Sequence, residues 1–381
     1  MAEPRFVPRV LDLNRLLAKK SHFLFGPRQT GKSSLIRATV RADRFYNLLE
    51  SDTLLALARE PRRLRQEVQK IGALVVIDEI QKLPQLLDEV QWLIEERKAR
   101  FLLTGSSARK LRGGGVNLLG GRARSRTLHP FVSREIEDLD LLRALSFGTL
   151  PSIYLSENPR EDLKSYTGDY LREEIAHEGL TRNIPAFSRF LEVAALCNGR
   201  ILNYTKIATD AQVPRTTVHE YFQILRDTLV GYDLMAWRKA RRRKPLSTSR
   251  FYFFDIGIAR ALQGRGPIDE RSADFGEALE AYLFHELRAW IDYRGDGDLA
   301  YWRTTSGFEV DFVLDGAAAI EVKSTRNAAG HDFKGLHAIH EETGVRRRYL
   351  VCLEPRPRIV DGIEVLPWRE FLARLWSDAL L

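Results

Sequence analysis

The sequence predicts an α/β protein that begins with a parallel sheet, continues through a helical middle segment and ends in a second α/β segment. Three observations support this prediction. Up to about residue 131, short apolar runs alternate with amphipathic stretches, which is typical of parallel strands joined by crossover helices. Between residues 133 and 227, apolar residues recur at helical spacing. Beyond residue 229, apolar strand-like runs return.

The length and composition indicate two or three globular domains. The chain has 381 residues, of which 44% are hydrophobic and 29% are charged, a mixture typical of folded globular proteins. We place the predicted domains at residues 1–132, 133–262 and 263–381.

The hydropathy pattern argues against a membrane or secreted protein. No apolar stretch is long enough to span a bilayer, and the amino terminus lacks the apolar core of a signal peptide. The two cysteines, Cys197 and Cys352, are far apart in the sequence, which excludes a disulfide scaffold and a cysteine zinc site. We therefore expect a cytoplasmic protein without a membrane partner.

The excess of basic residues suits a polyanionic partner such as DNA. Lysine and arginine number 59 against 51 aspartates and glutamates, a formal net charge of +8. Much of this charge lies in two clusters, for each of which a solvated loop is the alternative interpretation. The first cluster contains Arg109, Lys110, Arg112, Arg122, Arg124 and Arg126, and the second contains Arg238, Lys239, Arg241, Arg242, Arg243 and Lys244.

A phosphate-binding motif follows the first expected strand, His22–Phe25, and precedes a helical segment, Ser34–Val40. In such a loop, backbone N–H groups surround phosphate oxygens, Lys32 reaches the β- and γ-phosphates, and Ser33 can bind Mg²⁺. The sequence therefore predicts ATP and Mg²⁺ as cofactors. The predicted nucleotide contacts are Gly26, Pro27, Arg28, Gln29, Thr30, Gly31, Lys32 and Ser33, which fit G-x-x-x-x-G-K-[ST], and Ser34.

Two acidic residues follow the next expected strand, Leu74–Ile77. This order is typical of a buried strand that presents acids at its carboxyl end. We expect Asp78 to hold Mg²⁺ through water, and Glu79 to orient or deprotonate the attacking water. After a third strand, Phe101–Thr104, the Thr104 hydroxyl is a candidate sensor of the γ-phosphate. An ordinary strand-end turn is the alternative.

Arg122, in Gly120-Gly121-Arg122, is a candidate arginine finger. A finger supplied by one subunit stabilises the charge that develops on a neighbouring subunit's nucleotide. This assignment predicts a homo-oligomer, with a hexameric ring as one form. The alternative is a solvent-facing arginine in an already basic loop.

Taken in series, these motifs resemble one family, the prokaryotic AAA-type ATPases that carry a C-terminal domain of unknown function. The resemblance covers about residues 20 to 325 and implies an AAA-type P-loop ATPase core, a winged-helix segment and a nuclease-like end. The segments that carry it are Gly26–Ser33, Val76–Gln81, Leu103–Ala108, Gly120–Arg122, Phe147–Pro151, Tyr166, Tyr170-Leu171, Asn203-Tyr204 and Phe251–Gly257.

A helix-turn-helix is expected at Thr205–Ala211 and Arg215–Asp227, which a short turn separates. Arg215, Thr216 and Thr217 begin the second helix, where DNA-binding helices contact bases and phosphates. A hairpin over residues 229–254 would then form a wing. The alternative is a winged helix that only packs against the ATPase. The tip of the wing carries cations suited to phosphate contact, namely Arg238, Lys239, Arg241, Arg242, Arg243 and Lys244.

The C-terminal segment contains a candidate nuclease site. Asp311 lies on one expected strand, and Glu321 and Lys323 share a face of the next because side chains alternate along a strand. Asp311 and Glu321 are candidate Mg²⁺ ligands, Lys323 is a candidate stabiliser of a scissile phosphate, and Glu280 is a possible further member.

The order helix, three strands, helix, strand, together with the spacing of Asp311 and the Glu-x-Lys motif, resembles the restriction-endonuclease-like superfamily. Three interpretations remain open: a catalytic nuclease, a nuclease fold used only for binding, and surface charges. Three histidines, His129, His219 and His285, have no partners at ligand spacing and are expected to be ordinary side chains.

The sequence thus favours a Mg²⁺-dependent ATPase that binds DNA and remodels it or translocates along it, with branched DNA such as a Holliday junction as one substrate. The first alternative is a nucleotide-controlled switch that docks on DNA or on a protein without translocating. The second alternative is an ATP-linked DNA nuclease.

Overall fold

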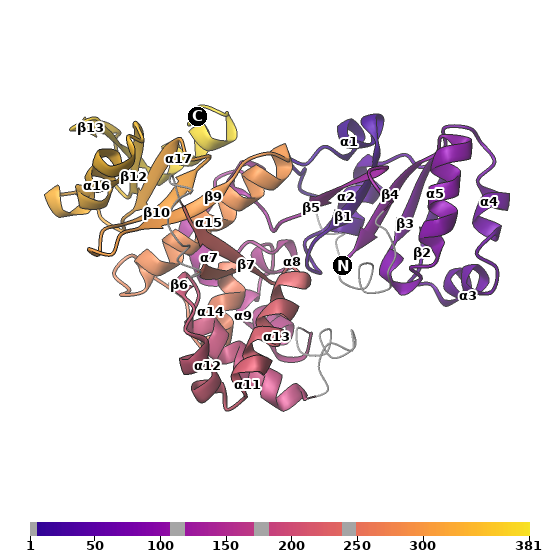
Figure 1. The fold of residues 1–381 in the computed structure, drawn as a ribbon, viewed down its shortest axis with the longest axis horizontal. Helices are drawn as coiled ribbons and strands as arrows, with labels where there is room; N and C mark the ends of the chain where they lie inside the picture. Colours follow the sequence, from indigo (N-terminus) through magenta and orange to yellow (C-terminus); the bar gives the residue numbers. More distant parts are fainter. Residues whose placement is uncertain (1–5, 107–118, 171–182, 238–248) are drawn as a thin grey trace. The chain divides into compact units, whose positions relative to one another are not determined.

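The computed structural model describes residues 6–106, 119–170, 183–237 and 249–381, which form two compact units (Figure 1). Met1–Phe131 and Asp227–Val230 belong to the N-terminal unit. Val132–Arg226 and Gly231–Leu381 belong to the C-terminal unit. The expected division into three domains at residues 132 and 262 remains a prediction.

The N-terminal unit contains a parallel five-stranded sheet, as the sequence predicts. The order of its strands is β2-β3-β4-β1-β5, so β4 lies between β1 and β3. All three expected strands are confirmed, whereas β2 and β5 were not expected because they are short, mostly polar edge strands. The strands are β1 (Ser21–Phe25), β2 (Arg44–Asn47), β3 (Leu74–Asp78), β4 (Arg100–Gly105) and β5 (Ala123–Thr127).

Helices cover both faces of this sheet because its central strands are apolar on both sides. Phe23, Val75 and Phe101 point to one face, where they join a core with residues of α3, α4 and α5. The opposite face is covered by α1 and α2 (Figure 1). The helices are α1 (Leu13–Lys19), α2 (Lys32–Thr39), α3 (Ser51–Arg59), α4 (Arg63–Glu67), the 3₁₀ turn η1 (Ile80–Lys82) and α5 (Leu86–Arg97).

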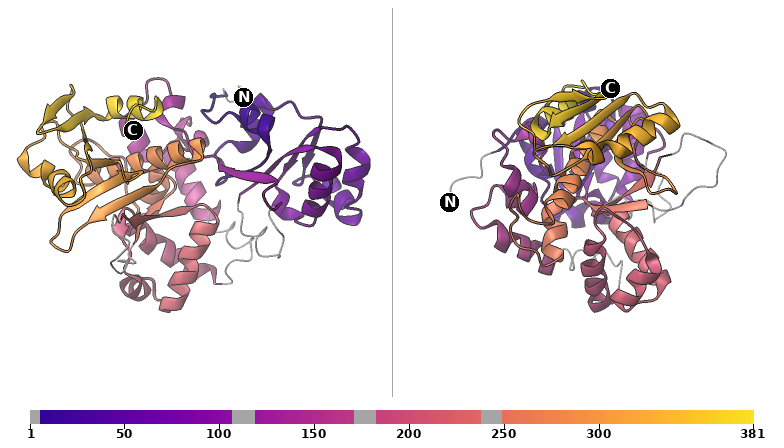
Figure 2. Two further views of the ribbon diagram at one scale, coloured as in Figure 1. Left: turned by 45° about the horizontal axis from the view of Figure 1, so that its top comes forward. Right: turned by 90° about the vertical axis from the view of Figure 1, so that its left-hand side faces the viewer.

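The C-terminal unit begins with helices, as the periodicity predicts. The two helices expected as a helix-turn-helix are present as α12 (Tyr204–Ala211) and α13 (Arg215–Asp227). Figure 2 shows this helical part, drawn in rose, protruding from the strands of the same unit. The preceding elements are η2 (Ser133–Glu135), α7 (Leu141–Phe147), α8 (Pro151–Tyr154), α9 (Pro159–Ser165), the π-helix η3 (Tyr166–Tyr170) and α11 (Ile184–Leu196).

The C-terminal unit also contains a nine-stranded mixed sheet, in the order β13-β14-β12-β11-β10-β9-β7-β8-β6. The hairpin expected as a wing belongs to this sheet, because β7 pairs in parallel with β9 at Met235 and Ala236. The strands are β6 (Arg200–Ile201), β7 (Gly231–Ala236), β8 (Ser249–Phe253), β9 (Leu299–Arg303), β10 (Glu309–Leu314), β11 (Ala318–Val322), β12 (Arg347–Cys352), β13 (Arg358–Val360) and β14 (Ile363–Pro367).

The expected order of helix, three strands, helix and strand is found in α15, β9 to β11, α16 and β12, and β13, β14 and α17 extend it. None of the helices that the structure describes is long and apolar enough to cross a membrane. The remaining helical elements are α14 (Ile256–Leu262), α15 (Phe275–Arg294), η4 (Gly330–Phe333), α16 (Lys334–Thr343) and α17 (Trp368–Trp376).

Candidate nucleotide site and C-terminal acid cluster

The loop between β1 and α2 has a backbone shape that depends on its glycines. Gly26 and Gly31 have φ angles of 151° and 91°, in the region that favours glycine. A Cβ atom on Gly26 would lie 2.5 Å from the carbonyl oxygen of Leu128, so no side chain fits there. The Thr30 hydroxyl donates to the carbonyl oxygen of Pro27 over 2.8 Å and closes the turn.

Lys32 begins α2, and its buried ammonium group points back into the loop. It donates to the carbonyl oxygens of Gly26 at 2.7 Å and Pro27 at 3.1 Å. Since a helix N-terminus presents unpaired N–H groups and partial positive charge, the loop and the lysine together suit phosphate oxygens. The remaining predicted contacts lie on the same turn, with Arg28, Gln29 and Ser34 exposed and Ser33 half-buried.

Ser33, Asp78 and Thr104 meet at the carboxyl edge of the sheet. The Ser33 hydroxyl donates to Asp78 Oδ2 over 3.1 Å, and the Thr104 hydroxyl donates to Asp78 Oδ1. A hydroxyl and a carboxylate are oxygen ligands of the kind that Mg²⁺ prefers, so Ser33 and Asp78 fit the predicted ion. Thr104 contacts this pair because β4 lies between β1 and β3.

Glu79 has a φ angle of 62°, which turns the chain sharply after β3. Its backbone N–H donates to the Thr104 hydroxyl over 3.1 Å. The Gln81 amide donates to Glu79 Oε2 and, over 3.3 Å, to the Ser106 hydroxyl. Gln81 was not among the sequence-predicted site residues, although its position two residues after Glu79 was a usable signal. It holds the Glu79 carboxylate in place just after the carboxyl end of β3.

Arg122 lies at the amino ends of the strands of this sheet, whereas the nucleotide loop lies at their carboxyl ends. It precedes β5, whose first residue, Ala123, pairs with Ser21 at the start of β1, whereas the nucleotide loop follows the end of β1. Its guanidinium Nη2 lies 2.5 Å from Glu95 Oε1, and the side chain is 38% exposed. The structure therefore does not bring Arg122 to the nucleotide loop of its own chain.

The predicted DNA contacts on α13 lie at the start of that helix. Arg215 and Thr216 are exposed and Thr217 is half-buried. The exposed His219 stacks on Tyr204 of α12, with ring centres 3.9 Å apart. The predicted wing cations lie outside the described residues, namely Arg238, Lys239, Arg241, Arg242, Arg243 and Lys244.

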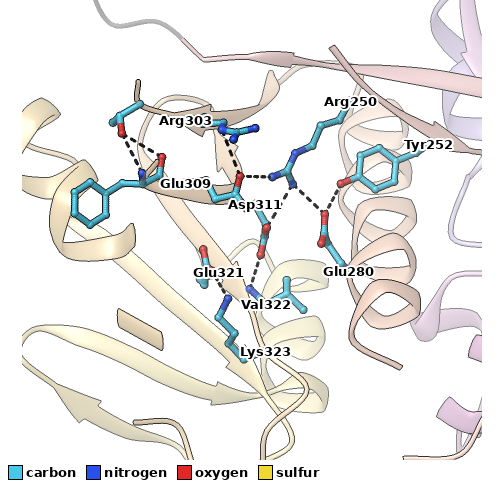
Figure 3. Close-up of polar contacts among 11 residues, drawn as sticks. Arg250, Tyr252, Glu280, Arg303, Glu309, Asp311, Glu321, Val322 and Lys323 are labelled. Carbon is cyan, nitrogen blue, oxygen red and sulfur yellow. Dashed lines mark hydrogen bonds and ion pairs between the residues drawn. The ribbon is translucent and has the colours of Figure 1, made fainter. Parts of the chain in front are cut away.

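The four residues of the predicted nuclease site come together in the C-terminal unit (Figure 3). Asp311 on β10 accepts a hydrogen bond at Oδ2 from the Val322 backbone N–H over 3.0 Å. Lys323 Nζ donates to Glu321 Oε1 over 2.6 Å. Glu280 on α15 accepts from the Tyr252 hydroxyl over 2.6 Å. The register of β10 and β11 and the position of α15 bring these side chains into one acid cluster.

Arg250 lies among these acids and was not predicted from the sequence. Its Nη1 atom is 3.1 Å from Glu280 Oε1 and 3.4 Å from Asp311 Oδ1, and its Nη2 atom is 3.2 Å from Glu309 Oε2. The side chain is 7% exposed, and the guanidinium carbon lies 5.0 Å from the ring centre of Tyr301. Arg250 therefore bridges carboxylates of α15 and β10 from strand β8 (Figure 3).

Burial raises the pKa of Asp311, Glu280 and Glu321, and the charge of Asp311 raises the pKa of Glu280 and Glu321 further. Although burial opposes its charge, Arg250 has a raised pKa because Tyr252 and the surrounding acids favour the cation. Across the residues that the structure describes, no group of three or more His, Cys, Asp or Glu side chains is arranged to hold a metal ion. The Mg²⁺ role of Asp311 and Glu321 remains a prediction.

A parallel sheet with a phosphate loop after β1 and acids after β3 defines the N-terminal unit as a P-loop nucleotide-binding fold. Residues 18–137 match the family described as an AAA domain. This match supports an AAA-type P-loop ATPase domain in the N-terminal part of the chain. Residues 138–269 match a domain of unknown function, DUF8612, and residues 275–371 match another, DUF4143. The latter match fits the expected C-terminal domain of unknown function.

No curated protein matches the chain. Among solved structures, NtrX from Brucella abortus is similar over 76% of this chain and 64% of that chain, with 13% identity and a TM-score of 0.21. This chain thus spans less than two thirds of that structure's length.

Proposed function

We propose that this protein is a Mg²⁺-dependent ATPase that binds DNA and uses hydrolysis to remodel it or to translocate along it. The observation that supports the ATPase most directly is the convergence of Lys32, Ser33, Asp78, Glu79 and Thr104 at one edge of the N-terminal sheet. These side chains come from three separate segments, which chance Gly-rich turns would not bring together.

Each side chain has a distinct role in this proposal. Lys32 would bind the β- and γ-phosphates, and Ser33 and Asp78 would hold the metal ion. Bound Mg²⁺ would offset the negative charge that develops on the phosphate oxygens. Glu79, whose carboxylate accepts a hydrogen bond from the Gln81 amide, would orient the attacking water and accept its proton. Thr104 holds both Asp78 and the Glu79 backbone in place.

DNA is the proposed partner because Arg215 and Thr216 are exposed at the start of α13 and the chain carries a formal net charge of +8. ATP turnover with and without duplex or four-way-junction DNA tests the proposal. A remodelling enzyme or translocase hydrolyses ATP faster when its DNA is present. Slow hydrolysis that DNA leaves unchanged, with the protein still bound, would instead indicate the nucleotide-controlled switch.

We expect replacement of the wing cations Arg241, Arg242 and Arg243 with alanine to weaken DNA binding about equally for all sequences. Each cation that no longer neutralises a phosphate lowers the slope of log K against log [salt] by roughly 0.9, so the triple variant lowers it by roughly 2.7. Fluorescence anisotropy over a salt series measures the slope. Replacement of Arg41, Arg59 and Arg62, three exposed arginines of the N-terminal unit, serves as the charge-matched control. An unchanged slope would place the DNA elsewhere, first of all on the cluster of residues 109–126.

We expect Arg122→Ala to lower ATP turnover only in an assembled protein, because Arg122 lies at the sheet edge opposite its own nucleotide loop and needs a neighbour's γ-phosphate. The loss expected for an arginine finger is on the order of 10³-fold. Arg124→Ala, an exposed arginine two residues away, is the control. Sedimentation of the ATP-bound protein measures assembly. A monomer at micromolar concentration would exclude both the ring and the finger.

An ATP-linked DNA nuclease is the remaining candidate function. The convergence of Asp311, Glu321 and Lys323 favours it (Figure 3). Metal-assisted cleavage also requires a divalent ion among these acids, and the charges of the acid cluster decide whether one can bind.

A further inference from the structure

The guanidinium of Arg250 lies where the carboxylates of the acid cluster converge. One nitrogen, Nη1, contacts both Glu280 and Asp311, at 3.1 Å and 3.4 Å, and the other, Nη2, contacts Glu309 at 3.2 Å. A metal ion shared by carboxylates on α15 and β10 would have to occupy the same space. Arg250 reaches this place because β8 continues the sheet beyond β9 and β7.

Five of the eight carboxylate oxygens of Glu280, Glu309, Asp311 and Glu321 contact a donor within the cluster. Asp311 uses Oδ1 for Arg250 and Oδ2 for the Val322 N–H. Glu280 Oε1 accepts from both Arg250 and Tyr252, and Glu321 Oε1 accepts from Lys323. Glu321 Oε2 is a buried oxygen of the described cluster for which the structure provides no hydrogen-bond partner. Mg²⁺ and Mn²⁺ sites need several oxygen ligands around one point, and the oxygens of Glu280 and Asp311 that converge on one point already contact Arg250 there.

The charges of the cluster nearly balance without a metal ion. Its acids are Glu280, Glu309, Asp311 and Glu321, and its cations are Arg250, Arg303 and Lys323. Four formal negative charges therefore face three positive ones. Adding a divalent cation would leave a net positive charge in a largely buried site, which is costly because buried like charges repel with little screening. Removing Arg250 would instead leave buried carboxylates unpaired.

We propose that Arg250 is the resident counter-cation of the acid cluster and occupies the place of a divalent metal ion. The native C-terminal site then binds neither Mg²⁺ nor Mn²⁺, and replacing Arg250 with a neutral residue converts it into a divalent-metal site centred on Glu280 and Asp311. This inference replaces the Mg²⁺ role predicted for Asp311 and Glu321, and it does not depend on the proposed ATPase activity.

Mn²⁺ binding to the full-length chain, measured by electron paramagnetic resonance without nucleotide, tests this inference. All variants carry Asp78→Asn, so that the nucleotide site contributes no metal signal. We expect no Mn²⁺ site that depends on Asp311 in this background. Adding Arg250→Met should create one site and tighten Mn²⁺ binding at least about ten-fold, and further adding Asp311→Asn should abolish it.

Two controls separate the position of the cation from its charge. Arg250→Lys keeps a cation in the cluster and should create no site. Arg303→Met removes an arginine whose Nε lies 3.9 Å from Glu309 at the more exposed side of the cluster, and it should also create none.

Two outcomes would overturn the inference. The first is an Mn²⁺ site in the Asp78→Asn background that disappears with Asp311→Asn. This measurement uses the native cluster, so it decides the question even if Arg250→Met does not fold. The second is a folded Arg250→Met variant, judged by circular dichroism, that gains no Mn²⁺ site.

Discussion

Glu79→Gln is expected to bind ATP as tightly as the parent protein and to hydrolyse it 10²- to 10⁴-fold more slowly, on the order of the contribution of a general base. The amide cannot accept a proton from the attacking water, but it preserves the shape of the turn after β3. Lys32→Ala is expected to lose nucleotide binding itself. Its ammonium lies inside the loop, within hydrogen-bond distance of two loop carbonyl oxygens, so its loss removes a buried cation from the place where phosphate oxygens would bind.

Titration with a fluorescent ATP analogue measures binding, and single-turnover phosphate release measures hydrolysis, so the two variants separate the steps. Glu96→Gln, an exposed glutamate on α5, is the matched control and should leave both unchanged. Equal phosphate release by Glu79→Gln and the parent would remove Glu79 from the mechanism.

Gly148→Ala is expected to destabilise the C-terminal unit by about 2–6 kcal/mol. Gly148 follows α7 with φ 77° and ψ −170°, a conformation that is essentially restricted to glycine and costs other residues about 1–3 kcal/mol. An alanine Cβ would also lie 1.9 Å from Asp255 Oδ1. The buried Asp255 cannot move freely, because it accepts backbone N–H groups of Thr149 and Ile258. The clash adds an overpacking cost of about 1–3 kcal/mol.

Urea denaturation followed by tryptophan fluorescence reports this unit, since five of the six tryptophans lie in it and only Trp92 lies outside. Gly264→Ala is the control. Gly264 has a similar φ of 69°, but no atom lies within 4 Å of the position that an alanine Cβ would take, so we expect a loss of only about 1 kcal/mol. Equal losses for the two variants would show that backbone strain alone, and not contact with Asp255, makes Gly148 necessary.

These two predictions concern two kinds of segment. One is a motif whose chemistry is known, and the other is a pair of segments that only a family resemblance singles out. The loop Gly26–Ser33 was recognised as a phosphate site from sequence, and its geometry fits that interpretation. Phe147–Pro151 and Phe251–Gly257 were recognised only as part of a family resemblance. In the structure they contact each other, with Asp255 against Gly148 and Gly257 against the Phe147 backbone. The two segments therefore form a packing contact at the end of α7 and the start of α14. Neither segment indicates this contact by itself.

Strands of the N-terminal sheet could be predicted where burial requires an apolar run in the sequence. They could not be predicted where the strand is exposed and has no such run. β1, β3 and β4 are central strands, so their apolar runs are visible in the sequence. β5 reads Ala-Arg-Ser-Arg-Thr and is a strand because β1 supplies its hydrogen-bond partners. An edge strand without apolar alternation has no such signal of its own.

The sequence by itself predicted the candidate nucleotide site, because each of its segments carries a local signal. The glycines shape one short loop, the helix that follows supplies N–H groups, and the acids come directly after an apolar strand. It also identified Asp311, Glu321 and Lys323 as a group, because strand periodicity places residues two apart on one face.

Only the tertiary structure decided what accompanies those acids. Arg250 is separated by 30 residues from Glu280 and by 61 from Asp311, and no periodicity links such distant positions. The pairing of β7 with β9 joins the hairpin to the C-terminal sheet, and α15 packs so that Glu280 faces β8. The balance of charge in a buried cluster depends on every side chain brought into it, so whether the acids bind a metal ion or an arginine is a property of the folded chain.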